Sequence, residues 1–136
     1  MEVKNFLESN YVTSPTVLVK EALAAISDNH RGAVLIIDEE QHLLGVLSDG
    51  DIRRALLRGS NILSPIKDII NQNPVKIVVN GDQPEMIQTK IEGVFHNNTA
   101  ITLLPVVDHE NKLVSVYTQN WREGKKSGKI SWSISL

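Results

Sequence analysis

The chain has 136 residues, a formal net charge of −2 at pH 7, and no cysteine. The lack of cysteine excludes disulfides, thiolate metal sites and thiol nucleophiles, and the weak negative charge gives no general attraction for nucleic acid or an anionic membrane. Residues 1–6 do not have the basic and apolar regions of a secretory signal, and no apolar run approaches the roughly 20 residues of a membrane helix. We therefore expect a cytoplasmic protein that binds neither nucleic acid nor a membrane.

The first half of the chain predicts the order strand, helix, strand, strand, helix. A short apolar stretch at residues 11–13 is followed by Ser14-Pro15, a suitable start for a helix. The next apolar residues recur at helical spacing, at Val19, Ala22, Leu23 and Ile26. Residues 34–37 and 43–48 are apolar strands around a polar turn, which is typical of a β-hairpin. A second helix follows, with one apolar side formed by Ile52, Ala55 and Leu56.

The second half repeats this order. After a linker at residues 64–70, an apolar stretch at residues 75–79 and Gln83-Pro84 precede a helix with the apolar residues Ile87, Ile91, Val94 and Phe95. Residues 104–118 match residues 34–48 without a gap, although the second copy is about one helical turn longer before its hairpin. Each unit alone is too small to bury a full core. We therefore predict an α/β sandwich of two β-α-β-β-α repeats, packed with pseudo-two-fold symmetry.

The end of the chain departs from the repeat. No apolar helix pattern follows Thr118, and residues 130–136 alternate apolar residues with serine, a period typical of a half-buried strand. We expect an edge strand there; a dimer contact and a disordered end are the alternatives. The predicted division is a first repeat with N-terminal arm and linker at 1–70, a second, divergent repeat at 71–122, and a tail at 123–136.

Residues 45–51, Gly-Val-Leu-Ser-Asp-Gly-Asp, are the segment with the strongest functional signal. A strand delivers Ser48 to the start of a helix, and Asp51 follows three residues later. A hydroxyl and a carboxylate at this spacing can hold a sugar diol, and a helix N-terminus with Arg53 and Arg54 in its first turn suits phosphate. N-capping alone would also select these residue types, and on local spacing capping is the more frequent explanation.

The repeated arrangement resembles a pair of cystathionine β-synthase (CBS) domains, also called the Bateman module, over about residues 11–121. The sugar-diol motif of that family is Gly, an apolar residue, any residue, Thr or Ser, two residues, then Asp. Gly45, Ser48 and Asp51 match it position for position. The longer run at residues 44–56 is similar to CBS pairs found beside sugar nucleotidyltransferase and sugar-phosphate isomerase domains.

By this resemblance, Ser48 and Asp51 hold ribose hydroxyls, and residues around Thr13 and Ala33 line the base pocket. The expected ligand is AMP, ADP, ATP or S-adenosylmethionine, with no separate cofactor. The resemblance also implies a homodimer that regulates a neighbouring domain, such as a sugar nucleotidyltransferase. The alternatives are a ligand-free dimerisation or interaction scaffold, and a regulatory fragment of a sugar nucleotidyltransferase or sugar-phosphate isomerase.

The second copy departs from the motif at two of its three positions. Ser115 stands in place of Gly, Thr118 is retained, and Trp121 stands in place of Asp. An indole N–H is only a donor and cannot accept bonds from ribose hydroxyls. We therefore expect at most one strong nucleotide site per chain.

Other reactive residue types favour simpler explanations. The four histidines form no close ligand pair and predict no metal site; they are His30, His42, His96 and His109. The acids at residues 38–40 fall in a hairpin turn, where solvated carboxylates are common, and no serine lies in a Gly-x-Ser-x-Gly setting. We predict a regulatory module with no catalytic residue.

Overall fold

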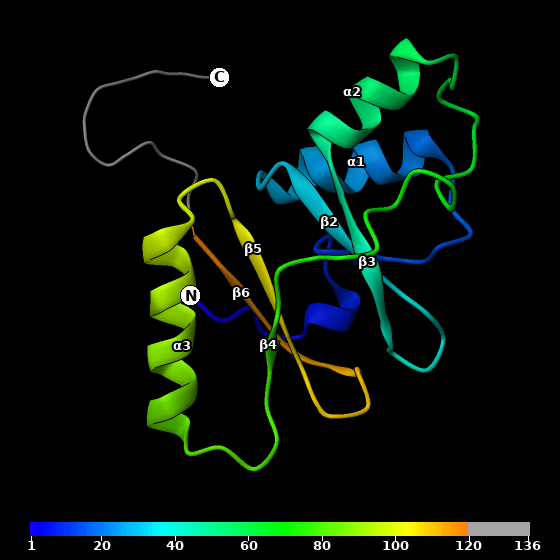
Figure 1. Cartoon of the computed structure of the whole chain (residues 1–136). Helices are drawn as coiled ribbons and strands as arrows, with labels where there is room; N and C mark the ends of the chain where they lie inside the picture. Colours follow the sequence, from blue (N-terminus) through cyan, green and yellow to red (C-terminus); the bar gives the residue numbers. More distant parts are fainter. Residues whose placement is uncertain (120–136) are drawn as a thin grey trace.

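The computed structural model describes residues 1–119 and contains two three-stranded sheets (Figure 1). In each sheet the first two strands are parallel and the second pair is antiparallel. In their order within the sheets, the strands are β1 (Val12–Thr13), β2 (Ala33–Ile37) and β3 (Leu43–Ser48), then β4 (Ile77–Val78), β5 (Leu103–Val107) and β6 (Leu113–Thr118). The helices are the short 3-10 helix η1 (Phe6–Glu8), then α1 (Val19–Asn29), α2 (Asp49–Leu57) and α3 (Pro84–Asn97).

The two hairpins share one register, at the offset of 70 residues that the sequence predicts. Ala33 pairs with Ser48 in the first hairpin, and Leu103 pairs with Thr118 in the second. A register shift also occurs at the same place in both hairpins, next to the turn. The predicted tandem α/β repeat is therefore confirmed.

The starts of the helices follow from local chemistry. The backbone N–H of Leu18 donates to the Glu21 carboxylate at 2.8 Å, so α1 begins at Val19, later than Ser14-Pro15 suggested. Pro84 is the first residue of α3, where its missing N–H leaves no bond unmade. Helix α3 has 14 residues against 11 in α1, which accounts for the extra turn expected in the second copy.

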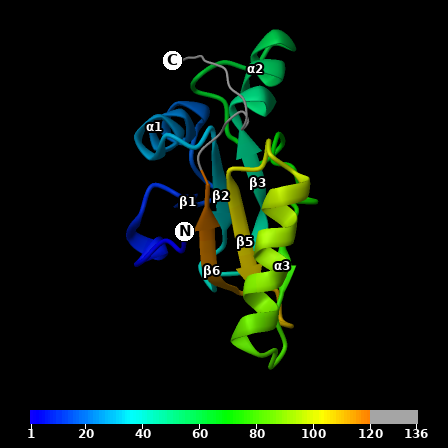
Figure 2. The same ribbon diagram turned by 90° about the vertical axis from the view of Figure 1, so that its left-hand side faces the viewer.

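Helices cover the outer face of each sheet, and the inner faces of the two sheets pack together. Figure 2 shows α1 and α2 beside β2 and β3, and α3 beside β5; α1 and α2 form one core cluster with the same face of the first sheet. The core between the sheets consists of Leu35, Leu43, Leu103, Val107, Leu113 and Val116. Full burial of such a side chain stabilises a fold by about 1.5–3 kcal/mol. This shared core therefore joins two repeats that are each too small to bury a full core alone.

Reciprocal hydrogen bonds between the hairpin turns follow the pseudo-two-fold axis. The backbone N–H of Leu43 donates to the Asn111 carbonyl at 2.9 Å, and the N–H of Leu113 donates to the Gln41 carbonyl at 2.8 Å. The two donors, Leu43 and Leu113, are 70 residues apart, and so are the two acceptors, Gln41 and Asn111. Gln41 and Asn111 also share a left-handed conformation, with φ of 73° and 66°.

Two segments extend the sheets across the predicted repeat boundary. Val46 and Asn71 exchange two backbone hydrogen bonds of 3.0 and 2.9 Å, which adds the end of the linker and the first residue of the second predicted repeat to the free edge of β3. The N-terminal segment takes the corresponding place beside β6, where the N–H of Val3 donates to the Val116 carbonyl at 2.7 Å. The first residues of each predicted repeat thus pair with the other repeat, and the division at residue 70 stays a prediction.

Trp121 and the expected edge strand at residues 130–136 lie outside the described residues. Among residues 1–119, no helix has the length and apolar character needed to cross a membrane.

Candidate ligand-binding site

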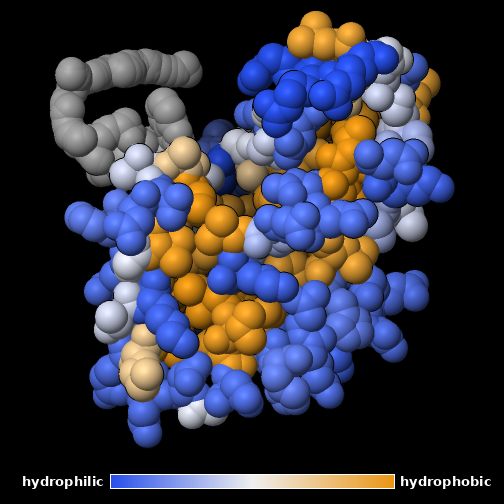
Figure 3. All heavy atoms as spheres, viewed as in Figure 1, coloured by the Kyte–Doolittle hydropathy of each residue, from blue (hydrophilic) through white to orange (hydrophobic). Residues whose placement is uncertain are grey.

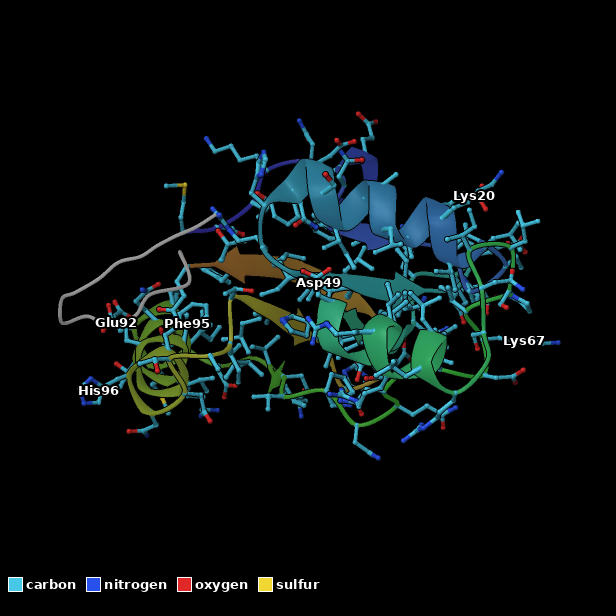
Figure 4. All side chains as sticks on the ribbon, turned by 90° about the horizontal axis from the view of Figure 1, so that it is seen from above. Lys20, Asp49, Lys67, Glu92, Phe95 and His96 are labelled. Carbon is cyan, nitrogen blue, oxygen red and sulfur yellow. The ribbon has the colours of Figure 1, made fainter. Side chains whose placement is uncertain are left out.

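A cavity of about 650 Å³ lies between the two repeats. Small-molecule sites in proteins have volumes of about 300–1,000 Å³. Figure 3 views this side of the molecule, where the surface is hollowed between the two halves and apolar side chains gather. In Figure 4, Asp49 of the cavity wall lies at the start of α2, toward α3. The walls come from four segments, within residues 30–35, 46–53, 71–75 and 100–105.

Ser48 and Asp51 form a reciprocal capping box at the start of α2. The backbone N–H of Asp51 donates to Ser48 Oγ at 3.1 Å, and the N–H of Ser48 donates to Asp51 Oδ2 at 3.0 Å. Such a cap stabilises a helix by about 1 kcal/mol. Ser48 and Asp51 therefore cap the helix, as their residue types predict. The two bonds do not use the Ser48 hydroxyl proton, and Ser48 also lines the cavity.

Asp51 and the two arginines of α2 lie in different surroundings. Arg54 Nη2 donates to Asp51 Oδ1 at 2.7 Å, and neither residue is among those that line the cavity. Arg53 does line it. Of the two residues predicted to hold the ribose hydroxyls, Ser48 thus lies on the cavity wall, whereas the Asp51 carboxylate is bonded within its own helix. The contact of Asp51 with ribose stays a prediction.

The other three predicted residues also occupy different positions. Ala33 begins β2 and lines the cavity, whereas Thr13 ends β1 and is not among the lining residues. Gly45 faces the linker, because a Cβ there would overlap the Asn71 carbonyl oxygen and the Ile70 side chain. The glycine of the motif therefore has a structural reason, the close approach of the linker to β3.

Arg31 is a cavity residue that the sequence analysis missed. Its Nε is buried and has no hydrogen-bond partner among residues 1–119, and its Nη1 reaches only the His30 carbonyl, at 3.4 Å. The backbone of Arg31 is held from both repeats: its N–H donates to Asn29 Oδ1 at 2.7 Å, and its carbonyl accepts from Thr102 Oγ1. In the sequence, the signal for this role is a basic residue just before the first hairpin, and Arg31 lies outside the motif at 45–51.

The second repeat presents different atoms at the equivalent positions. Ser115, the counterpart of Gly45, donates from Oγ to the Glu2 carboxylate. The backbone N–H of Thr118, the counterpart of Ser48, donates to the Met1 carbonyl at 2.8 Å. The N-terminal segment therefore contacts both positions. The expectation of at most one strong nucleotide site per chain stays a prediction.

The turn of the first hairpin brings Asp38, Glu40 and His42 together, with their ligand atoms within 4.8 Å of one another. Asp38 Oδ1 accepts from the backbone N–H groups of Glu40 and His42 at 2.9 and 2.8 Å. Asp108 accepts the corresponding pair of bonds in the second turn, where Lys112 replaces the histidine. Because the arrangement recurs with a lysine, it is explained by the turn and does not point to a metal site.

The same hydrogen bonds lower the pKa of both aspartates. For Asp108 the N–H of Lys112 is the largest cause, and partial desolvation opposes it. For Asp38 desolvation raises the pKa, but the bonds from His42 and Glu40 together outweigh it and hold the pKa below its ordinary value. Both carboxylates are ionised at neutral pH, where they stabilise the turns.

Comparison with known proteins gives sequence relatives of greater length. The sequence profile of the CBS domain matches residues 3–58. An uncharacterised protein of Helicobacter pylori is 33% identical over 118 residues, which cover 85% of this chain and 34% of the relative. Arabinose 5-phosphate isomerase KdsD of Francisella tularensis is 31% identical over 110 residues, which cover 80% of this chain and 32% of the relative. The chain thus spans about a third of the length of these curated relatives.

Solved structures share the fold. A CBS domain pair/ACT domain protein from Thermotoga maritima has a TM-score of 0.62 and 21% identity, covering 87% of this chain and 89% of its own. A CBS domain protein from Pyrobaculum aerophilum, complexed with AMP, has a TM-score of 0.57 and 22% identity, covering 79% and 78%. The cytosolic domain of the Mg²⁺ channel MgtE, in complex with ATP, has a TM-score of 0.57 and 24% identity, covering 80% and 42%. Residues 3–58 therefore match the CBS domain family, and the chain has the fold of the solved CBS-domain pairs.

Proposed function

We propose that this chain is a non-catalytic regulatory module that binds an adenine nucleotide between its two repeats and so modulates a partner protein or domain. The observation that carries the proposal is the cavity, in which a serine hydroxyl, a helix N-terminus, arginine side chains and apolar strand residues converge. These are the groups that a sugar, a phosphate and a base require.

Each part of an adenine nucleotide has a counterpart in the cavity wall. The Ser48 hydroxyl can donate to a ribose oxygen. The N-terminal end of α2, next to Arg53, attracts phosphate through the helix dipole. The N–H groups of Asp49 and Asp51 are already bonded, to the Gly32 carbonyl and to Ser48 Oγ. An apolar wall for the base is available from Ala33, Leu35, Val46, Val75, Ile101 and Leu103.

The choice of nucleotide rests on the solved structures with this fold. One of them is complexed with AMP and another with ATP. We therefore propose AMP, ADP or ATP as the ligand, and these structures give no support for S-adenosylmethionine. The cytoplasm stays the expected location for such a sensor.

The position of the cavity also suggests how ligand binding changes the arrangement of the two repeats. Its walls belong to both repeats, and the hydrogen bond from Thr102 to the Arg31 carbonyl joins the repeats at its edge. A ligand that touches both walls changes their relative placement by its difference in affinity for the two arrangements.

Calorimetric titration and thermal denaturation with AMP and ATP test the proposal. A ligand at about 100 times its dissociation constant stabilises the protein by about 2.7 kcal/mol. Ser48→Ala and Asp51→Asn should weaken binding; asparagine is preferred to alanine because an amide oxygen can still accept from the Ser48 N–H. Ser27→Ala, on the exposed surface of α1, is the matched control and should bind as wild type. No heat and no stabilisation with either nucleotide at millimolar concentration would contradict the proposal.

A ligand-free scaffold is the second candidate, and one observation favours it. Ser48 and Asp51 already satisfy each other in the capping box, so neither side chain requires a ligand. Native mass spectrometry separates the two functions, because a scaffold would be a homodimer without nucleotide, whereas our proposal predicts a homodimer that retains or takes up nucleotide.

The regulated partner is proposed from the relatives. One relative is an arabinose 5-phosphate isomerase, of which this chain covers about a third. We propose that the module regulates, or is a regulatory part of, a sugar-phosphate isomerase or sugar nucleotidyltransferase. Co-purification of such an enzyme with the tagged chain, with activity that responds to AMP, would support this assignment; an enzyme that is unaffected by AMP would contradict it.

A further inference from the structure

We infer that Arg31 is the residue that anchors the phosphoryl group of the ligand, and so gives the cavity its preference for an anion. This inference rests on the proposed nucleotide site and names a residue outside the motif at 45–51. Arg31 lines the cavity, and no carboxylate within residues 1–119 forms an ion pair with it.

The Nε atom of Arg31 is the first reason. It is buried, and within the described part of the chain it has no hydrogen-bond acceptor. A buried, charged donor without a partner is costly, and a guanidinium presents its N–H groups as a fixed fork that matches phosphate oxygens. A phosphoryl group in the cavity is an acceptor for this fork once the Arg31 side chain turns its N–H groups toward it.

The contrast with the neighbouring arginines is the second reason. Arg54 is already paired with Asp51 at 2.7 Å. Arg53 lines the cavity but is exposed, so water and salt screen its charge. Of these three side chains, Arg31 is the one with a buried N–H that is still unpaired.

The backbone of Arg31 is also fixed in a way that suits an anchor. Its N–H donates to Asn29 Oδ1 in the first repeat, and its carbonyl accepts from Thr102 Oγ1 in the second. An anion bound by Arg31 therefore contacts a residue that both repeats hold. Asp49 also lines the cavity, and its carboxylate repels an anion, so the attraction for a phosphoryl group depends on the arginines of the wall.

Titration with AMP and with adenosine separates the phosphate contact from the rest of the site. We expect wild type to bind AMP more tightly than adenosine, and Arg31→Gln to weaken AMP binding by about 10- to 100-fold, the effect of losing a charged hydrogen bond. Adenosine binding should not change. Arg58→Gln, on the exposed end of α2 and away from the cavity lining, is the control and should leave both affinities unchanged.

Stability without ligand distinguishes an anchor from a structural residue. Arg31 makes its hydrogen bonds to Asn29 and Thr102 through its backbone, so unliganded Arg31→Gln should unfold at the same temperature as wild type or higher. A lower unfolding temperature, an equal loss of AMP and adenosine binding, or unchanged AMP binding would overturn the inference.

A phosphate titration keeps the inference testable if the proposed function fails. If wild type binds neither AMP nor adenosine, the thermal midpoint is measured with inorganic phosphate in wild type and Arg31→Gln. A rise in wild type that is absent in the variant supports an anion site at Arg31 without a nucleotide. An equal rise in both, or no rise in wild type, overturns it.

Discussion

Replacing Gly45 by alanine separates the structural role of the motif glycine from any role in ligand binding. Gly45 lies where the linker crosses β3, and an added Cβ would overlap the Asn71 carbonyl oxygen and the Ile70 side chain. The obstacle includes backbone, so a side-chain rotation cannot relieve it. Gly45→Ala should therefore push the linker away from the edge of β3.

The size of the effect follows from the contacts at risk. Val46 and Asn71 exchange two backbone hydrogen bonds of 3.0 and 2.9 Å, each worth about 0.5–1.5 kcal/mol net. Their loss, or the strain of keeping them in an overpacked site, destabilises by about 1–3 kcal/mol. We expect Gly45→Ala to lower the free energy of unfolding by this amount.

Urea denaturation of wild type and variant measures this change. Gly93→Ala is the control, because Gly93 lies in α3 and a Cβ there meets no heavy atom within 4 Å. Alanine in a helix is favoured over glycine by about 0.5–1 kcal/mol, so the control should be neutral or more stable. Equal stability of Gly45→Ala and wild type would refute the packing argument and leave ligand contact as the reason for the glycine.

Two further predictions concern the caps and turns. Ser48→Ala removes the acceptor of the Asp51 N–H and should cost about 1 kcal/mol in urea denaturation even without ligand; no loss would show that the cap contributes nothing. The pKa of Asp108 is lowered in the folded chain, so the stability it contributes is complete above its unfolded value of about 3.9 and is lost as the pH falls below it. Asp108→Asn should therefore show a smaller fall in thermal midpoint than wild type between pH 7 and about pH 3, and an equal fall would contradict this assignment.

The fold was predictable because its signals are local. The gapless match between residues 34–48 and 104–118 predicts two equivalent hairpins, and they share one register. Pro84 marks the first residue of α3. Helix α1 begins at Val19, the first residue of the predicted apolar face and four residues after Pro15, where the Leu18 N–H donates to the Glu21 carboxylate.

The cavity was only partly predictable, because half of its wall comes from distant segments. Ser48, Ala33 and Arg53 are predicted from the sequence and line it. The sequence does not single out Arg31, because its significance depends on burial and on Thr102, which is 71 residues away in sequence. The closeness of the linker to Gly45 is likewise a tertiary contact, which no local pattern reveals.

The central claim is that one adenine nucleotide binds between the repeats, and a crystal structure of the chain with AMP tests it most directly. We predict one AMP per chain in the cavity, with the ribose beside Ser48 and the phosphate beside Arg31. AMP bound outside this cavity, or a cavity without AMP at saturating concentration, would contradict the account.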